Sequence, residues 1–134
     1  MSKLSIRIYY EDTDAGGVVY YAHYLQYIER RRSEMLRIPG FEQDQINKDF
    51  GVLFVVRKVT ANYLKPAKFD DLIEVQTEIK SVGKASLIFS QKIVNIRQNT
   101  VLFDAEVKVV SVFTQNLKPC GIPQAISEKL NGRK

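Results

Sequence analysis

The chain has 134 residues, 45% hydrophobic and 26% charged, which is typical of a folded domain and excludes a disordered chain. Its formal net charge of +5 favours anionic partners such as phosphorylated cofactors or nucleic acid, although solubility alone explains it equally well. No apolar run approaches the roughly 20 residues of a membrane-spanning helix, and no signal peptide is visible. The single cysteine, Cys120, excludes an intrachain disulfide and suits a reducing compartment. We therefore expect one cytoplasmic domain over residues 1–134, without a transmembrane segment.

The first predicted elements are a short strand and, after a loop, one long helix. Leu4, Ile6 and Ile8 alternate with polar residues, as in a strand with one covered face. From residue 20 to about 37, apolar side chains recur at helical spacings, and Pro39-Gly40 ends the pattern. The apolar positions of this predicted helix face are Tyr21, Tyr24, Leu25, Ile28, Met35 and Leu36.

Four predicted strands follow a polar connector that has room for one helical turn at 42–49. Alternating Val, Ile, Phe, Leu, Tyr and Thr residues predict these strands at 51–65, 71–82, 85–97 and 101–114. The connections are too short for crossover helices, so the four strands are predicted to form an antiparallel meander. A short helix is predicted at 125–130. A sheet with one apolar face and one amphipathic helix predicts an α+β domain in which the sheet curls around the helix.

The segment between the first strand and the long helix carries the strongest functional signal. Residues 9–20 read Tyr-Tyr-Glu-Asp-Thr-Asp-Ala-Gly-Gly-Val-Val-Tyr, a cluster of acids followed by two glycines. The glycines let the backbone turn sharply onto a helix N-terminus, whose unpaired N–H groups can hold an oxygen that gains negative charge. Asp14 opposite such an end fits attack on an acyl carbonyl. Taken alone, an acid here is more often a turn or capping residue, and Glu11 and Asp12 fit solvated loop charges equally well.

Residues 9–20, with Ala22, Tyr24 and the segment 29–34, closely resemble the 4-hydroxybenzoyl-CoA thioesterase family, and within it the Tol–Pal-associated acyl-CoA thioesterases. The resemblance spans nearly the whole chain. It implies the hotdog fold, a five-stranded antiparallel sheet wrapped around one long central helix. It also implies hydrolysis of acyl-CoA thioesters at sites between two subunits of a homodimer or homotetramer, with no metal or redox cofactor.

The resemblance assigns roles to particular residues. Asp14 matches the catalytic carboxylate, which acts as nucleophile or as general base on water. Tyr21 matches the position whose backbone N–H polarises the thioester carbonyl, and Lys84 falls near a basic turn that helps hold the CoA phosphates in relatives. Many relatives carry His where this chain has Tyr21; the one histidine here, His23, lies two positions further on and is a candidate to support the acid. Substrate-binding positions are assigned to Gly17, Val18, Tyr24 and Lys84.

Other readings of the same residues stay open. The Arg30-Arg31-Arg32 run resembles a phosphate patch, but consecutive helical residues point in different directions, which favours a mostly solvated face and no nucleic-acid partner. No Gly-x-Ser-x-Gly elbow and no zinc-ligand spacing occur in the sequence. The alternatives to hydrolysis are a hydratase or dehydratase that uses His23, and a non-catalytic module that binds RNA, acyl carrier protein or a membrane-associated partner.

Overall fold

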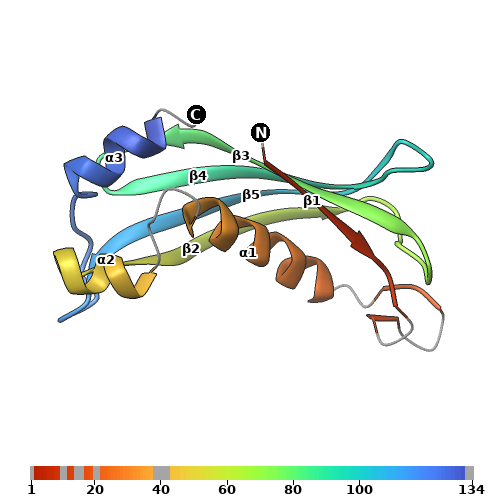
Figure 1. Ribbon diagram of the computed structural model, residues 1–134, viewed down its shortest axis with the longest axis horizontal. Coiled ribbons are helices and arrows are strands. Elements are labelled where there is room, and N and C mark those ends of the chain that lie inside the picture. Colours follow the sequence, from red (N-terminus) through yellow and green to blue (C-terminus); the bar gives the residue numbers. More distant parts are fainter. Residues whose placement is uncertain (1, 10–11, 14–16, 20–21, 38–42, 132–134) are drawn as a thin grey trace.

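A computed structural model of the chain shows a curved antiparallel sheet with a long helix lying across one face (Figure 1). The structure describes residues 2–9, 12–13, 17–19, 22–37 and 43–131. The elements are β1 (Ser2–Arg7), α1 (Ala22–Arg37), α2 (Gln43–Phe50), β2 (Val52–Tyr63), β3 (Leu72–Val82), β4 (Ser86–Asn95), β5 (Thr100–Phe113) and α3 (Gln124–Asn131). This confirms the predicted α+β hotdog architecture, in which five antiparallel strands wrap around one long helix.

The strand order is β1-β3-β4-β5-β2, so the predicted four-strand meander is correct for β3, β4 and β5 but wrong for β2. β2 pairs with β5 from Val52↔Phe113 to Tyr63↔Phe103, which leaves the other edge of β3 to β1. The connector 64–71 reaches about 26 Å at roughly 3.3 Å per residue, whereas three strand spacings span only about 14 Å. A short connector can therefore step across β4 and β5 without a crossover helix.

The helix α1 packs on β1, β3 and β4, and its N-terminal end points towards the loop after β1 (Figure 1). Tyr24 and Ile28 are buried, as the helical spacing predicted. Two details of the predicted face are wrong: Leu25 is 40% exposed, and Tyr27, which the pattern missed, is only 2% exposed. Tyr27 lies one turn from Tyr24 and next to Ile28, so these three side chains form the stripe that faces the sheet.

A polar network lies beneath α1 and corrects the expectation of a mostly solvated arginine run for Arg32, whereas Arg30 is exposed as expected. Arg32 is 8% exposed, and its Nη1 donates to Oε1 of Gln91 at 2.8 Å. The Gln91 amide donates in turn to the Ile28 carbonyl and to the Thr77 hydroxyl, both at 2.8 Å. Burial lowers the pKa of the Arg32 guanidinium, and the nearby Glu29 carboxylate opposes that shift. Arg32 follows Ile28 by four positions, so the helix places it on the buried face.

We expect Gln91→Leu to lower the free energy of unfolding by about 2–4 kcal/mol. Leucine fills much of the same space, but it removes the acceptor of a buried guanidinium and the donor to a buried carbonyl. Chemical denaturation followed by circular dichroism measures the change. The same exchange at the exposed Gln115 serves as control and should stay within about 0.5 kcal/mol. An equal decrease in the free energy of unfolding for both variants would contradict a structural role for the network.

Candidate functional site

The described part of the glycine-containing loop pairs with the connector between β2 and β3. The Val19 N–H donates to the Ala67 carbonyl at 2.7 Å, and the Phe69 N–H donates to the Gly17 carbonyl at 3.3 Å. Val18 lies opposite Lys68 in an antiparallel bridge. Gly17 has φ of 78°, a left-handed conformation that a residue with a side chain rarely adopts. The loop and the connector therefore form one structural unit at the end of the sheet nearest the start of α1.

Asp14 and Tyr21 lie outside the described residues, so their predicted roles stay predictions. The described residues around them belong to this same end of the molecule: Thr13 pairs with Val19, and α1 begins at Ala22. Among the other predicted site residues, Gly17, Val18, His23 and Tyr24 are brought together here.

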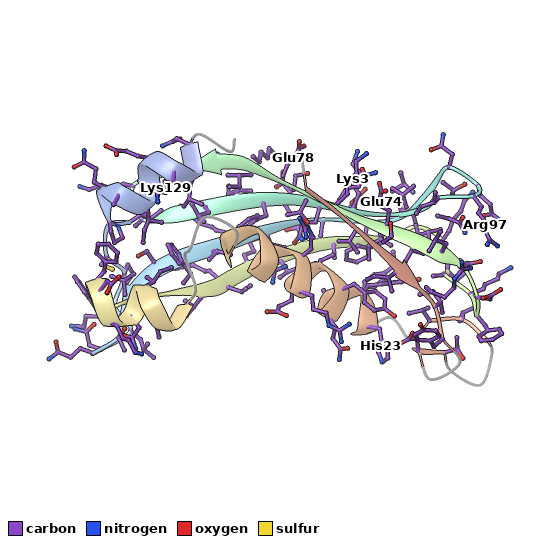
Figure 2. The ribbon with its side chains drawn as sticks, in the orientation of Figure 1. Lys3, His23, Glu74, Glu78, Arg97 and Lys129 are labelled. Carbon is purple, nitrogen blue, oxygen red and sulfur yellow. The ribbon has the colours of Figure 1, made fainter. Side chains whose placement is uncertain are left out.

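Asp12 joins the loop to the first turns of α1. One of its carboxylate oxygens accepts the Tyr9 N–H at 3.0 Å, and the other lies 3.4 Å from Nδ1 of His23. Burial and the neighbouring Asp12 carboxylate raise the pKa of the Tyr27 phenol. Figure 2 places His23 at this end of α1, beside the loop. The sequence reading missed this cluster because nothing in the spacing of Asp12, His23 and Tyr27 reveals the turn that brings the acid back to the helix.

Tyr24 connects α1 to the connector. Its phenol oxygen accepts the buried Ala67 N–H at 2.8 Å, and its ring lies 5.6 Å from that of Tyr63 and 5.4 Å from that of Phe103. Burial raises the pKa of the Tyr24 phenol, while the hydrogen bond from Ala67 acts in the opposite direction. This predicted substrate-binding residue is thus also a structural tie between the helix and the segment that pairs with the loop.

We expect Tyr24→Phe to lower the free energy of unfolding by about 1–3 kcal/mol, because it leaves the buried Ala67 N–H without an acceptor. The same exchange at Tyr9, which is 63% exposed, is the matched control and should change stability by no more than about 0.5 kcal/mol. Thermal and urea unfolding measure both variants. A Tyr24→Phe protein as stable as the control would show that this hydrogen bond contributes nothing to the fold.

Two adjoining cavities open beside the connector. The larger, about 430 Å³, is lined mainly by apolar and aromatic side chains, namely Val19, Tyr24, Tyr63, Leu64, Lys65 and Pro66. The smaller, about 180 Å³, shares Lys65 and Pro66 and is otherwise lined by Lys68, Asp71, Gln98 and Leu102. An apolar cavity of this size next to a helix N-terminus can hold a hydrophobic acyl group with its carbonyl near polar donors.

Lys84 is not brought to this site within one chain. It follows β3, and its carbonyl accepts the Ile122 N–H at 2.8 Å near α3. β3 has 11 residues and runs away from the connector, so its first and last residues lie about 33 Å apart at roughly 3.3 Å per residue. Figure 1 shows α2 and α3 at this opposite end of the sheet.

Within the part of the chain that the structure describes, no three His, Cys, Asp or Glu side chains gather as a metal site would require. Among the same residues, no helix has the length and apolar character needed to cross a membrane.

Comparison with known proteins gives consistent relatives over nearly the whole chain. The family model described as "Thioesterase superfamily" matches residues 16–102. Acyl-CoA thioester hydrolase YbgC of Escherichia coli O6:H1 is 51% identical over 121 residues, which are 90% of this chain and 89% of that protein. Acyl-CoA thioesterase YbgC of Helicobacter pylori strain 26695 is 35% identical over 132 residues, covering 93% and 96%. The crystal structure of a probable thioesterase from Bartonella henselae superposes with a TM-score of 0.81 at 33% identity, covering 91% and 98%.

Proposed function

Since the chain belongs to the thioesterase superfamily, we propose that it hydrolyses acyl-CoA thioesters to a free acid and CoA. It would act as a single hotdog domain over residues 1–134. The observation that carries the proposal is the 430 Å³ apolar cavity, whose walls include Val19 of the motif and Tyr24 of the first turns of α1. The relative from Escherichia coli, named acyl-CoA thioester hydrolase, supports the same substrate class at 51% identity.

The proposed chemistry requires one acid and one hydrogen-bond donor. The thioester carbonyl oxygen gains negative charge when an oxygen nucleophile adds to its carbon, and a fixed N–H at that oxygen is typically worth about 10²–10³ in rate. The backbone N–H of Tyr21 is assigned this role. Asp14 either attacks the carbon, forming an anhydride that water then cleaves, or deprotonates the attacking water directly. In both routes the carbon–sulfur bond breaks and CoA leaves as a thiolate, so no elaborate general acid is needed.

The cluster around Asp12 fits a positioning role in this scheme. Its carboxylate contacts both the Tyr9 backbone and the His23 ring, so it ties the loop after β1 to α1. His23 would then act through Asp12 and not on the substrate itself. A loop held at both ends keeps an acid in a defined place, which is the main requirement for a near-attack geometry.

A homodimer or homotetramer is supported by the exposed edge of the sheet. β2 is an edge strand, and it exposes the apolar side chains Val55, Val56, Val59 and Tyr63. An exposed apolar edge invites pairing with a second copy. Tyr63 and Leu64 also line the 430 Å³ cavity, so a second copy at this edge would complete the acyl site. We further propose a cytoplasmic location, which the unpaired, buried Cys120 suits, and acyl carrier protein as a second source of acyl groups.

A panel of acyl-CoAs of graded length, from acetyl to palmitoyl and including benzoyl, tests the function, with release of free thiol as the readout. Turnover of at least one member, with a preference set by how the acyl group fills the cavity, is the expected result. Release from none, together with salt-sensitive binding of RNA or acyl carrier protein, would favour the non-catalytic module.

One observation favours a hydratase or dehydratase as second candidate. That chemistry uses a His paired with an acid, and Nδ1 of His23 lies 3.4 Å from the Asp12 carboxylate. The hydratase activity can be measured with a 2-enoyl-CoA as substrate. Hydration removes the conjugated double bond, so the absorbance of the conjugated thioester falls. If His23→Ala abolishes this activity while Asp14→Asn retains it, the second candidate replaces hydrolysis.

A further inference from the structure

The two cavities beside the connector differ in chemistry although they share a wall. Lys65 and Pro66 line both. On one side lie the aromatic and aliphatic walls of the 430 Å³ cavity; on the other, the 180 Å³ cavity presents Lys68, Asp71 and the Gln98 amide. Such a pair of spaces fits an amphiphilic ligand that carries its apolar and its charged groups at different ends.

The backbone around the two lysines is held firmly. The N–H groups of Leu64 and Lys65 donate to the Leu102 carbonyl at 2.9 and 3.1 Å. The Lys68 N–H donates to Oδ2 of Asp71 at 2.8 Å, and Lys68 pairs with Val18 of the site loop. Both side chains therefore extend from fixed positions beside the proposed catalytic loop.

Among the residues that the structure describes, no acid forms an ion pair with either lysine. Lys65 and Lys68 are exposed. The Asp71 carboxylate already accepts the Lys68 backbone N–H, and Asp70 lies 3.6 Å from the Arg7 guanidinium. Lys65 and Lys68 line the same 180 Å³ cavity and have no described ion-pair partner, which makes this cavity a favourable place for an anion.

We propose that Lys65 and Lys68 bind the phosphates of the CoA moiety while the larger cavity holds the apolar part of the substrate; this rests on the proposed function. The assignment replaces Lys84, which lies at the other end of β3 within the chain. Two ammonium groups act on the diphosphate or on the ribose phosphate as point charges, so they strengthen substrate binding without taking part in bond breaking.

Calorimetric titration with CoA and with pantetheine, which lacks the phosphates, tests the assignment in the full-length protein. The double variant Lys65→Gln/Lys68→Gln should raise the Kd for CoA by about tenfold and leave the Kd for pantetheine unchanged. Added salt should reduce the difference in Kd for CoA between the wild type and the double variant, because salt screens exposed charge pairs. Lys118→Gln, an exposed lysine in the turn after β5, is the matched control for loss of charge. Circular dichroism establishes that each variant is folded.

Turnover adds a second readout. For the double variant, KM for acyl-CoA should rise about tenfold at nearly constant kcat, while KM for the same acyl group on N-acetylcysteamine stays at the wild-type value. The assignment would be overturned if the double variant lost kcat/KM equally on both substrates, or if it bound CoA as tightly as the wild type. Weaker CoA binding by Lys84→Gln alone would also overturn it. If no thioester is hydrolysed, the proposed function fails, and the CoA titration still decides whether these lysines hold the phosphates.

Discussion

Asp14→Asn is expected to lower kcat for acyl-CoA hydrolysis by about 10³-fold, within the range for loss of a general base or nucleophile. The amide has nearly the same size, but it neither attacks a thioester nor removes a proton from water. KM should change little, since described residues of the apolar cavity such as Tyr24, Tyr63 and Leu64 supply contacts to the acyl group that the exchange leaves intact. Steady-state thiol release under saturating substrate measures the effect.

Asp70→Asn is the matched control for this experiment. Asp70 lies at the same end of the molecule, is exposed, and has φ of 67°, a left-handed conformation that asparagine also tolerates. The exchange removes one negative charge without disturbing the backbone, so activity should stay within about twofold, as for other exposed sites. If both variants lose activity equally, the effect of Asp14→Asn reflects charge or folding and not catalysis.

The second large effect is expected for Tyr21→Pro, which should lower kcat by about 10²–10³-fold, because proline removes the one backbone N–H assigned to the carbonyl oxygen. Position 21 directly precedes α1, which begins at Ala22, and proline is well tolerated at the start of a helix. The fold should therefore survive, which circular dichroism and unfolding measurements establish.

Tyr21→Ala separates the backbone from the side chain at the same position. It keeps the N–H and removes the phenol ring, so its loss of kcat should be far smaller than that of the proline variant. A Tyr21→Ala protein as slow as Tyr21→Pro would move the role from the backbone N–H to the tyrosine side chain. That result would also indicate that the side chain at position 21, which is His in many relatives and Tyr here, takes part in the reaction.

Local patterns in the sequence predicted the helices and strands. The features that these patterns missed depend on contacts between residues far apart in the sequence. The alternation in 51–65 predicted a strand, and β2 is there, but nothing in it reveals that its partner is β5 and not β3. Arg32 belongs to a run that reads as solvated, yet the Gln91 amide, 59 positions away, makes its burial possible. Hydrogen-bond partners of this kind are set by the tertiary fold and leave no local signal.

For the candidate site too, the sequence predicted local features and missed those that depend on the tertiary fold. The motif at 9–20 predicted a site in the loop before the long helix, and the pairing of Gly17–Val19 with the connector places the described part of that motif beside the apolar cavity. The resemblance to the family implied Lys84, in a basic turn, as the phosphate ligand. Lys65 and Lys68 could not be preferred to it from the sequence, because their nearness to the motif depends on the path of the β2–β3 connector.

A crystal structure with a non-hydrolysable acyl-CoA analogue, in which a methylene group replaces the thioester sulfur, tests the central claim most directly. We predict an Asp14 carboxylate oxygen or its bound water at about 3–3.5 Å from the carbonyl carbon, and the Tyr21 N–H at about 3 Å from the carbonyl oxygen. The acyl chain should occupy the cavity beside Tyr24 and Tyr63. A carbonyl bound elsewhere, or an Asp14 side chain turned to solvent in that complex, would contradict the account.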